Sequence, residues 1–307
     1  MSAGHFENVA IIGAGGRIGS VMAEDLLKQG KHKVTAITRP ESTSKLPDGL
    51  HDVKKLEYND HASLVEAFKG QDIVLITMNV LAPNDSQEKL IDAAVEAGVR
   101  YIMPNEWGGD YSDEELGRET GLGPGAIAIH KHVEGKGAFS LSGSEIRYGF
   151  DFKERKLTLF DDGKQKHSCS TWPQVGRAVA KLLSLPVSGP SPCLDDWKNG
   201  CVHINSFDLS QQDMFESVLR VTHTKESDWT ISHENTKERY QRGQEMFKQG
   251  DWHGFGTFPY TRVFYPDGKG LWTDLDNEKL GLPKEDLDKA TKVAVHYAES
   301  GEAAAWS

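Results

Sequence analysis

The stretch VAIIGAGGRIG, residues 9–19, decides the fold of this chain. Its first four residues are apolar and mostly β-branched, so they predict a short strand buried on both faces. A turn rich in glycine follows, and a helical pattern begins behind it. Glycines let the backbone approach a phosphate, and a helix N-terminus offers unpaired N–H groups to an anion. This order of elements predicts a nucleotide-phosphate site; the alternative is a glycine loop that serves only a tight turn. The residues predicted to form the site are Gly13, Gly15, Gly16, Arg17, Ile18 and Gly19.

The composition is that of an ordinary globular protein. With 307 residues, 37% of them hydrophobic and 26% charged, the chain is long enough to bury a sizeable core. Its net charge of −11 argues against a nucleic-acid or acidic-membrane partner, because binding phosphates needs a basic face. The longest apolar run, residues 73–78, is too short to span a bilayer, and the N-terminal MSAGHFEN has no apolar signal segment. We therefore expect a cytoplasmic protein.

The cysteines and histidines do not suggest a metal site. Cys169, Cys193 and Cys201 form no C-x-x-C pair, so they indicate reduced thiols rather than a disulfide framework or a zinc ribbon. His130 and His132 would point to opposite sides of a helix, which argues against a shared metal ion. The sequence predicts no metal, and either histidine could instead help in proton transfer.

Strands and helices alternate through the first half of the chain. Short connections between them imply right-handed crossovers and a parallel sheet, so the predicted fold class is α/β, a Rossmann-type doubly wound sheet. The predicted strands are residues 9–12, 33–38, 53–58, 72–77 and 101–103, and the predicted helices are residues 18–26, 63–68 and 85–97.

The second strand ends in Thr38-Arg39-Pro40, with no acidic residue before Glu41. An acidic residue near this point binds the ribose 2′-hydroxyl of NAD, whereas an arginine accommodates the 2′-phosphate of NADP. A guanidinium suits a phosphate because it can donate two hydrogen bonds at once. Arg39, assisted by Lys45, therefore predicts NADPH as the cofactor; the alternative is a solvated loop arginine.

The regular alternation of strands and helices ends after residue 111, and helices, strands and loops then follow in no regular order. The second half therefore reads as a smaller α+β region, packed on the edge of the sheet where its strands end. We predict an NADP-binding domain over residues 1–150 and a substrate-binding region over residues 151–307. Predicted helices are residues 113–119, 126–133, 173–185, 213–222, 234–248 and 284–299, and predicted strands are residues 150–160, 202–206 and 229–232.

Residues at the ends of the fourth and fifth strands are candidates to line the cofactor groove. They are Thr77, Met78, Asn79 and Asn105, with Trp107 beside them. The alternative for Asn105 and Trp107 is structural packing. Farther along the chain, aromatic residues could form an apolar substrate wall or belong to the core. They are Trp252, Phe255, Phe258 and Tyr260.

These stretches resemble the isoflavone-reductase-like, NmrA-like group of atypical short-chain dehydrogenases, in particular its fungal members. The matching stretches are VAIIGAGGRIG, VTAITR, MPNEWGGD, FDFKERKLTLFDDG, STWPQVGRAVAKLLSLP and LDNEKLGLPKEDLDKATKVAV. The resemblance covers nearly the whole chain. It implies a Rossmann domain with bound NADPH, a smaller C-terminal substrate domain, and reduction of phenolic or other secondary-metabolite substrates. Some members of the group are redox-sensing regulators rather than enzymes.

The resemblance also implies a catalytic lysine. Most short-chain dehydrogenases use Tyr-x-x-x-Lys on a helix, but the match here, Tyr265 to Lys269, contains Pro266 and Gly268 and predicts a turn. The resembling group places a lone lysine at the start of the helix after the fifth strand, and Lys131 is nearest that place. A lysine near a carbonyl can serve in proton transfer. The alternative is a surface lysine.

One interval departs from the resembling proteins, which carry a sixth sheet strand between residues 133 and 149. Here that interval holds GKGAFSLSGSEIRY, which has no continuous apolar run of the length a strand needs. We therefore predict a sixth strand that is short or missing over residues 134–149, and a reshaped substrate pocket.

The sequence thus predicts an NADPH-dependent reductase that passes hydride from the nicotinamide to an activated double bond or carbonyl of a small molecule. The alternative is a non-catalytic NADP(H)-sensing regulatory protein that acts through a protein partner.

Overall fold

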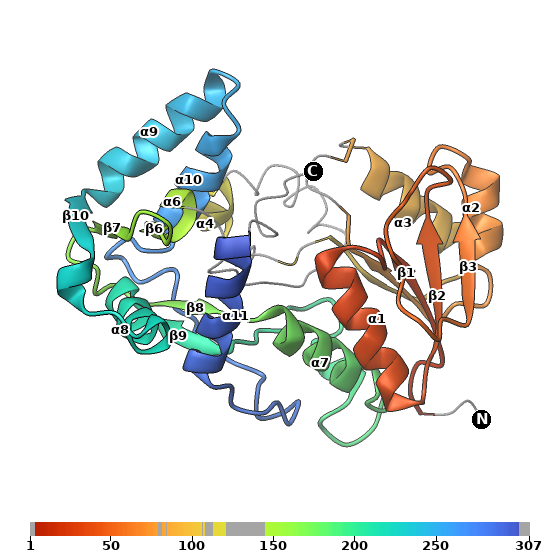
Figure 1. The fold of residues 1–307 in the computed structure, drawn as a ribbon. Helices are drawn as coiled ribbons and strands as arrows, with labels where there is room; N and C mark the ends of the chain where they lie inside the picture. Colours follow the sequence, from red (N-terminus) through yellow and green to blue (C-terminus); the bar gives the residue numbers. More distant parts are fainter. Residues whose placement is uncertain are drawn as a thin grey trace.

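The computed structural model of the chain describes residues 4–78, 82–83, 85–105, 107, 113–120 and 145–300. A parallel sheet covered by helices forms one side of the molecule, and a region of helices and short strands forms the other (Figure 1). No helix among the described residues has the length and apolar character needed to cross a membrane.

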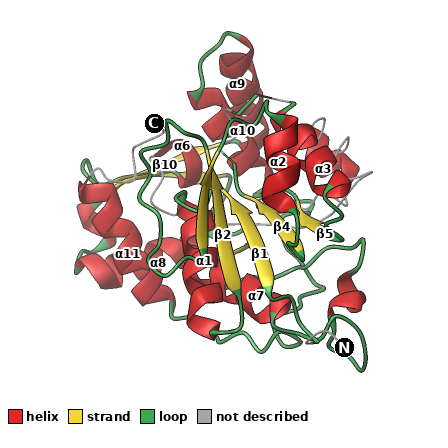
Figure 2. Cartoon of the chain, turned by 90° about the vertical axis from the view of Figure 1, so that its right-hand side faces the viewer, coloured by secondary structure: helices red, strands yellow, loops and turns green. Residues whose placement is uncertain are grey.

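The central sheet has five parallel strands in the order β3-β2-β1-β4-β5 (Figure 2). Their bounds are β1 Asn8–Ile12, β2 Lys33–Thr38, β3 Asp52–Lys55, β4 Ile73–Ile76 and β5 Tyr101–Met103. The order reverses between β1 and β4, and ligands of open α/β sheets bind at such a switch point, beyond the carboxyl ends of the strands. The predicted α/β class is confirmed, and Gly13 and Thr77 follow the two strands at the switch point.

Helices cover both faces of this sheet. They are α1 Arg17–Gln29 and α7 Trp172–Leu183 on one face, and α2 His61–Phe68 and α3 Ser86–Glu96 on the other. Side chains of β1 alternate between the two cores: Val9 and Ile11 pack with α1 and α7, whereas Ala10 and Ile12 pack with α2 and α3. This explains why residues 9–12 are apolar without a break.

The second half adds two small sheets, in the orders β10-β7-β6 and β8-β9. The strands are β6 Phe150–Asp151, β7 Lys156–Phe160, β8 His167–Cys169, β9 Phe207–Leu209 and β10 Thr230–Glu234. Helices α4 Glu114–Glu119 and α6 Glu145–Tyr148 precede these strands in the chain. The other helices of the second half are α8 Gln211–Thr222, α9 Thr236–Lys248, α10 His253–Arg262 and α11 Leu287–Ser300, with short turns η1 Leu194–Trp197 and η2 Glu226–Asp228. A third core, rich in aromatic side chains, holds this region together.

Two strand predictions in the second half are wrong. Residues 150–160 form two antiparallel strands rather than one, because the Asp151 carboxylate accepts the backbone N–H groups of Lys153 and Glu154 and turns the chain. Residues 202–206 join no strand ladder; the strand is the next segment, β9, which pairs with β8. Helix α10 was not predicted, since Pro259 lies inside it.

The division of the chain at residue 150 stays a prediction. Helix α7 comes from the second half, yet it packs on α1 and shares the core of the central sheet. The helix predicted over residues 126–133 lies outside the described residues, as does the part of the interval 134–149 before α6. The prediction of a short or missing sixth strand therefore stays open.

Candidate functional site

The glycine turn leaves no room for side chains at two of its positions. Gly13 has φ +81°, and a Cβ there would lie 2.2 Å from the backbone oxygen of Thr77. A Cβ on Gly19 would lie 2.2 Å from the backbone oxygen of Gly13. The first contact fixes the tight turn and the second brings α1 against the strand ends, as in a dinucleotide-binding turn. The structure therefore brings Gly13, Gly15, Gly16 and Gly19 together at the switch point.

The first turn of α1 is suited to an anion. Its N-cap is Gly16, no described side chain caps the helix, and the first turn carries no acidic residue. N–H groups without side-chain acceptors and the positive end of the helix dipole both favour a phosphate. Ser44 and Lys45 border this turn, since a Cβ on Gly15 would lie 2.7 Å from the Ser44 Cβ and 3.2 Å from the Lys45 backbone oxygen.

Polar side chains fix the end of β4 beside the turn. The Thr77 hydroxyl donates to the Ile12 carbonyl at 2.7 Å. The Asn105 amide accepts from the Met78 N–H at 2.9 Å and donates to the Met78 carbonyl at 3.0 Å. The Trp107 indole N–H donates to the Ile76 carbonyl at 2.7 Å. Asn105 and Trp107 thus hold the backbone at the end of β4, which is the packing role that the sequence left open.

Arg39 lies at the carboxyl end of β2 with its guanidinium exposed. Its Nε is 3.1 Å from Glu41 Oε1, and both side chains are more than half exposed, at 60% and 58%. Such surface ion pairs contribute about 1 kcal/mol or less, so Glu41 is a weak competitor for a phosphate. Nearby, burial raises the pKa of Tyr58 to about 12, so its hydroxyl stays protonated. Lys45 is exposed, in the loop beside the glycine turn.

Arg17 is the first residue of α1, and its guanidinium carbon lies 5.5 Å from the centre of the Trp172 ring. Trp172 begins α7, in the second half of the chain. Sequence reasoning missed Trp172, because nothing local indicates that residues so far apart meet. Ile18 is partly buried against the core between α1 and α7.

Several predicted residues lie outside the described part of the chain. They are Asn79, His130, Lys131 and His132. Their roles, including that of Lys131 in proton transfer, stay predictions.

The four aromatic residues proposed as a substrate wall lie in different surroundings. Phe258 is buried, whereas Trp252 is 58% exposed at the N-cap of α10. Phe255 packs between Phe247 and Trp252, and Tyr260 packs on Tyr148 and Arg147. Phe258 therefore belongs to the core, which the sequence had left open as the alternative to a substrate wall.

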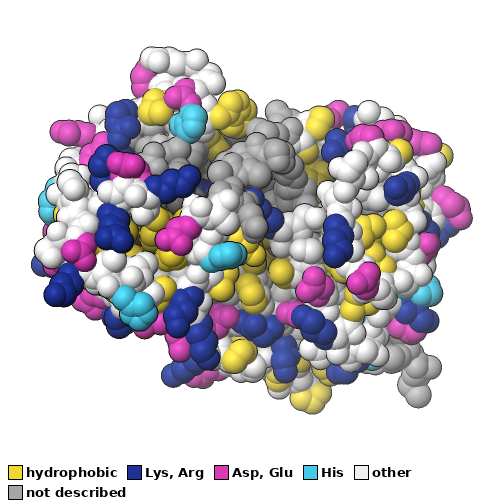
Figure 3. Space-filling view, in the orientation of Figure 1, with side chains coloured by type: hydrophobic (Ala, Val, Ile, Leu, Met, Phe, Trp, Pro, Cys, Tyr) yellow, Lys and Arg dark blue, Asp and Glu magenta, His cyan; other side chains and the backbone are white. Residues whose placement is uncertain are grey.

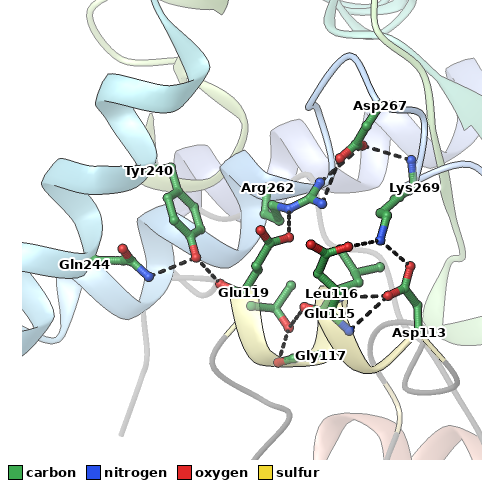
Figure 4. Close-up of polar contacts among 11 residues, drawn as sticks. Asp113, Glu115, Leu116, Gly117, Glu119, Tyr240, Gln244, Arg262, Asp267 and Lys269 are labelled. Carbon is green, nitrogen blue, oxygen red and sulfur yellow. Dashed lines mark hydrogen bonds and ion pairs between the residues drawn. The ribbon is translucent and has the colours of Figure 1, made fainter.

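The segment Tyr265 to Lys269 is a turn, as its proline and glycine predict. Lys269 Nζ lies 2.9 Å from Asp113 Oδ2 and 2.7 Å from Glu115 Oε2 (Figure 4). These carboxylates raise the pKa of the Lys269 amine, so it stays charged. Lys269 therefore has a structural role and is no substitute for a catalytic lysine.

The same network ties α4 to α10. The buried Arg262 guanidinium pairs with Glu119 at 2.5 Å and with Asp267 at 2.8 Å, and the Tyr240 hydroxyl donates to the Glu119 carbonyl at 2.6 Å (Figure 4). Helix α4 follows the end of β5, so this network links the carboxyl ends of the sheet strands to the C-terminal region.

No group of three or more His, Cys, Asp or Glu side chains in the described part of the chain is arranged to hold a metal ion. On the face drawn in Figure 3, basic and acidic side chains are interspersed over the described residues.

The chain is similar to known proteins along nearly its whole length. Residues 6–118 match the model of the NmrA-like family. The chain is 26% identical to oxidoreductase aprR of Aspergillus flavus over 92% of its own length and 96% of that protein. It is 24% identical to oxidoreductase poxI of Penicillium oxalicum over 86% of each chain. A shorter match, 32% identical, joins 42% of this chain to 44% of isoflavone reductase homolog P3 of Arabidopsis thaliana.

Solved structures show the same fold. An isoflavone reductase superposes with a TM-score of 0.69 at 17% identity, covering 94% of this chain and 99% of that one. AtPrR2, solved with NADP+ and (+)pinoresinol, superposes with a TM-score of 0.70 at 18% identity, covering 95% of this chain and 100% of that one. At these identities the likeness concerns the fold. Residues 6–118 thus match the NmrA-like family, and the chain is similar along nearly its whole length to fungal oxidoreductases and shares its fold with isoflavone-reductase-like structures.

Proposed function

We propose that this chain is an NADPH-dependent reductase of a small phenolic or other secondary-metabolite molecule. The observation that carries the proposal is the turn in which Gly13 and Gly19 have no space for a Cβ, at the uncapped start of α1. When bound, the dinucleotide supplies a hydride for an activated double bond or carbonyl of the substrate.

The residues around the turn divide the binding of the cofactor between them. The glycine turn and the first N–H groups of α1 would hold the pyrophosphate. Arg17 and Ile18, the first residues of α1, would belong to the same binding site. Arg39 would bind the 2′-phosphate, with Lys45 near it. Asn105 would hold Met78, beside Thr77, as one wall of the cofactor site, because its amide pairs with the Met78 backbone. Lys131 would support proton transfer, as the resemblance implies.

The substrate class rests on the names of relatives. Partial matches include phenylcoumaran benzylic ether reductases of Betula pendula and Nicotiana tabacum, and a structural neighbour is solved with (+)pinoresinol. The relatives that match along nearly the whole chain are fungal, and their names state no substrate. As part of this proposal, residues 151–307 would bind a small phenolic or other secondary-metabolite substrate.

Cofactor titrations test the proposal. NADPH, NADP+ and NADH are titrated by intrinsic tryptophan fluorescence, and NADPH consumption is then followed with a panel of phenolic and enone compounds. We expect the protein to prefer NADPH, and Arg39→Ala to weaken NADPH binding about tenfold or more while leaving NADH unchanged, because a charge-assisted bidentate contact is lost. An unchanged preference in Arg39→Ala would contradict the role of Arg39.

Glu41→Gln is the matched control for this experiment. It removes the carboxylate that pairs with Arg39 and would repel a phosphate, so NADPH binding should tighten about twofold to fivefold. Tight binding of NADP+ without turnover of any compound would point to the regulatory alternative instead of a reductase.

A further inference from the structure

Helices α1 and α7 lie side by side and run in the same direction (Figure 1). Trp172 contacts Arg17 where both helices begin, and a Cβ on Gly176 would meet the Val21 backbone one turn farther on. Beyond the end of α1, His32 Nε2 lies 3.0 Å from the hydroxyl of Ser184, which caps α7. The start of α7 therefore lies beside the glycine turn.

The packing of the two helices fixes this arrangement. A Cβ on Gly176 would lie 2.7 Å from the Val21 backbone oxygen and 3.0 Å from Asp25 Oδ2, so the helices approach as closely as a glycine allows. Val175 and Val179 are buried in the core that α1 shares. Interiors packed in this way deform little, so the first turn of α7 has a set position relative to α1.

Hydrogen bonds hold the first turn of α7 from the other side. The Thr171 hydroxyl caps the helix by accepting the Gln174 N–H at 3.2 Å, and it donates to Glu285 Oε2 at 2.7 Å. The Thr171 N–H donates to the Ser206 hydroxyl at 3.0 Å. Arg177, one turn along α7, pairs with the same Glu285. Trp172 follows directly after Thr171, so its backbone is anchored at several points.

We propose that Trp172 is a positioning residue of the cofactor site, whose indole holds the Arg17 guanidinium at the glycine turn for the phosphates of the dinucleotide. A guanidinium over an aromatic face is attracted by the ring, and a side chain ordered beforehand loses less rotamer freedom when a ligand binds. The inference rests on the proposed function, and it gives the second half of the chain a part in cofactor binding.

Isothermal titration of NADPH, which does not depend on tryptophan emission, tests the proposal. Trp172→Leu should raise the Kd about twofold to fivefold, and Trp172→Phe should recover part of the loss because Phe attracts cations less strongly than Trp. In the Arg17→Gln background, Trp172→Leu should add no further loss. With a substrate that turns over, the KM for NADPH should rise while kcat stays the same.

Trp197→Leu is the matched control. It removes a similar contact, Lys279 over the Trp197 ring at 5.8 Å, beside the core that α1 and α7 share but away from the turn, and should leave the Kd unchanged. A wild-type Kd in Trp172→Leu, or losses that simply add in the Arg17 double variant, would overturn the proposal. If Trp172→Leu does not fold, the same cycle is run with Trp172→Phe. Failure of the wild-type protein to bind NADPH would instead overturn the proposed function.

Discussion

At the scale of single residues, the glycines of the turn differ in why a side chain is excluded at each position. Gly13 needs its positive φ and the space beside Thr77, and Gly19 needs the space beside Gly13. A Cβ on Gly16 would lie 3.2 Å from the Gly13 backbone oxygen, which is a tight contact but a less severe one than those at Gly13 and Gly19. A glycine at position 16 also leaves room for the close approach of a ligand.

His167 is a buried titratable group far from this turn. It is 3% exposed, its ring stacks on Tyr148 with centroids 5.7 Å apart, and the Phe264 ring is 4.6 Å away. Its Nδ1 lies 3.1 Å from the Ser168 carbonyl, and its Nε2 has no hydrogen-bond partner among the described residues. Burial lowers the pKa of His167 from 6.5 to about 4. The fold therefore holds this imidazole neutral.

This pKa predicts an acid-dependent loss of stability. Well above pH 6.5, His167 is neutral in both the folded and the unfolded chain. Between pH 6.5 and pH 4, the unfolded chain binds a proton at this histidine and the folded chain largely does not, so stability falls as the pH falls. The free energy of unfolding should fall by about 2 kcal/mol between pH 7 and pH 5 relative to His167→Phe, which keeps the ring but cannot titrate. Urea unfolding of both proteins at each pH measures the difference. Parallel curves for the two proteins would show that His167 does not contribute.

Helices and strands were predicted well where local pattern decides them. Helix α1 ends where Gly30 takes a left-handed conformation, and α7 begins at the Thr171 cap, both of which are visible in the sequence. Helix α10 is different: it contains Pro259 and lacks a polar face, and it forms because it packs on α9. A Cβ on Gly254 would lie 2.3 Å from the Gly243 backbone oxygen, so a glycine pair permits this packing.

The contact between α1 and α7 makes a prediction about Gly176. Gly176→Ala places a Cβ 2.7 Å from the Val21 backbone oxygen, which cannot move away as a flexible side chain could. Overpacking of this kind costs about 1–3 kcal/mol, so the free energy of unfolding should fall by that amount in urea denaturation. In Gly200→Ala the new Cβ would lie 3.6 Å from the Trp197 backbone oxygen, an ordinary contact, and stability should stay the same. Equal stability of the two variants would contradict this account.

At the scale of the whole molecule, the Arg262 network joins the two halves. Its guanidinium is 2% exposed, and the partners Glu119 and Asp267 come from α4 and from the turn after α10. A buried cation is tolerated because both carboxylates and the Tyr265 ring, 4.6 Å away, surround it.

Arg262→Met should weaken the contact between α4 and α10. It keeps the apolar stem but leaves Glu119 and Asp267 without their cation, and the free energy of unfolding should fall by about 2 kcal/mol. Amide hydrogen exchange should also become faster in α4. The control is Arg220→Met, which removes an exposed pair with Asp288 and should change stability little. A smaller effect for Arg262→Met than for Arg220→Met would refute the role of the network.

The sequence by itself determined the order of strands and helices in the first half of the chain, the glycine turn and the position of Arg39, because periodicity, glycine geometry and helix caps act over a few neighbouring residues. Only the tertiary structure decided that α7 completes the first core, that Trp172 meets Arg17, and that Arg262 reaches Glu119. These contacts join residues more than a hundred positions apart along the chain. Their formation depends on how whole helices pack, which no local pattern records.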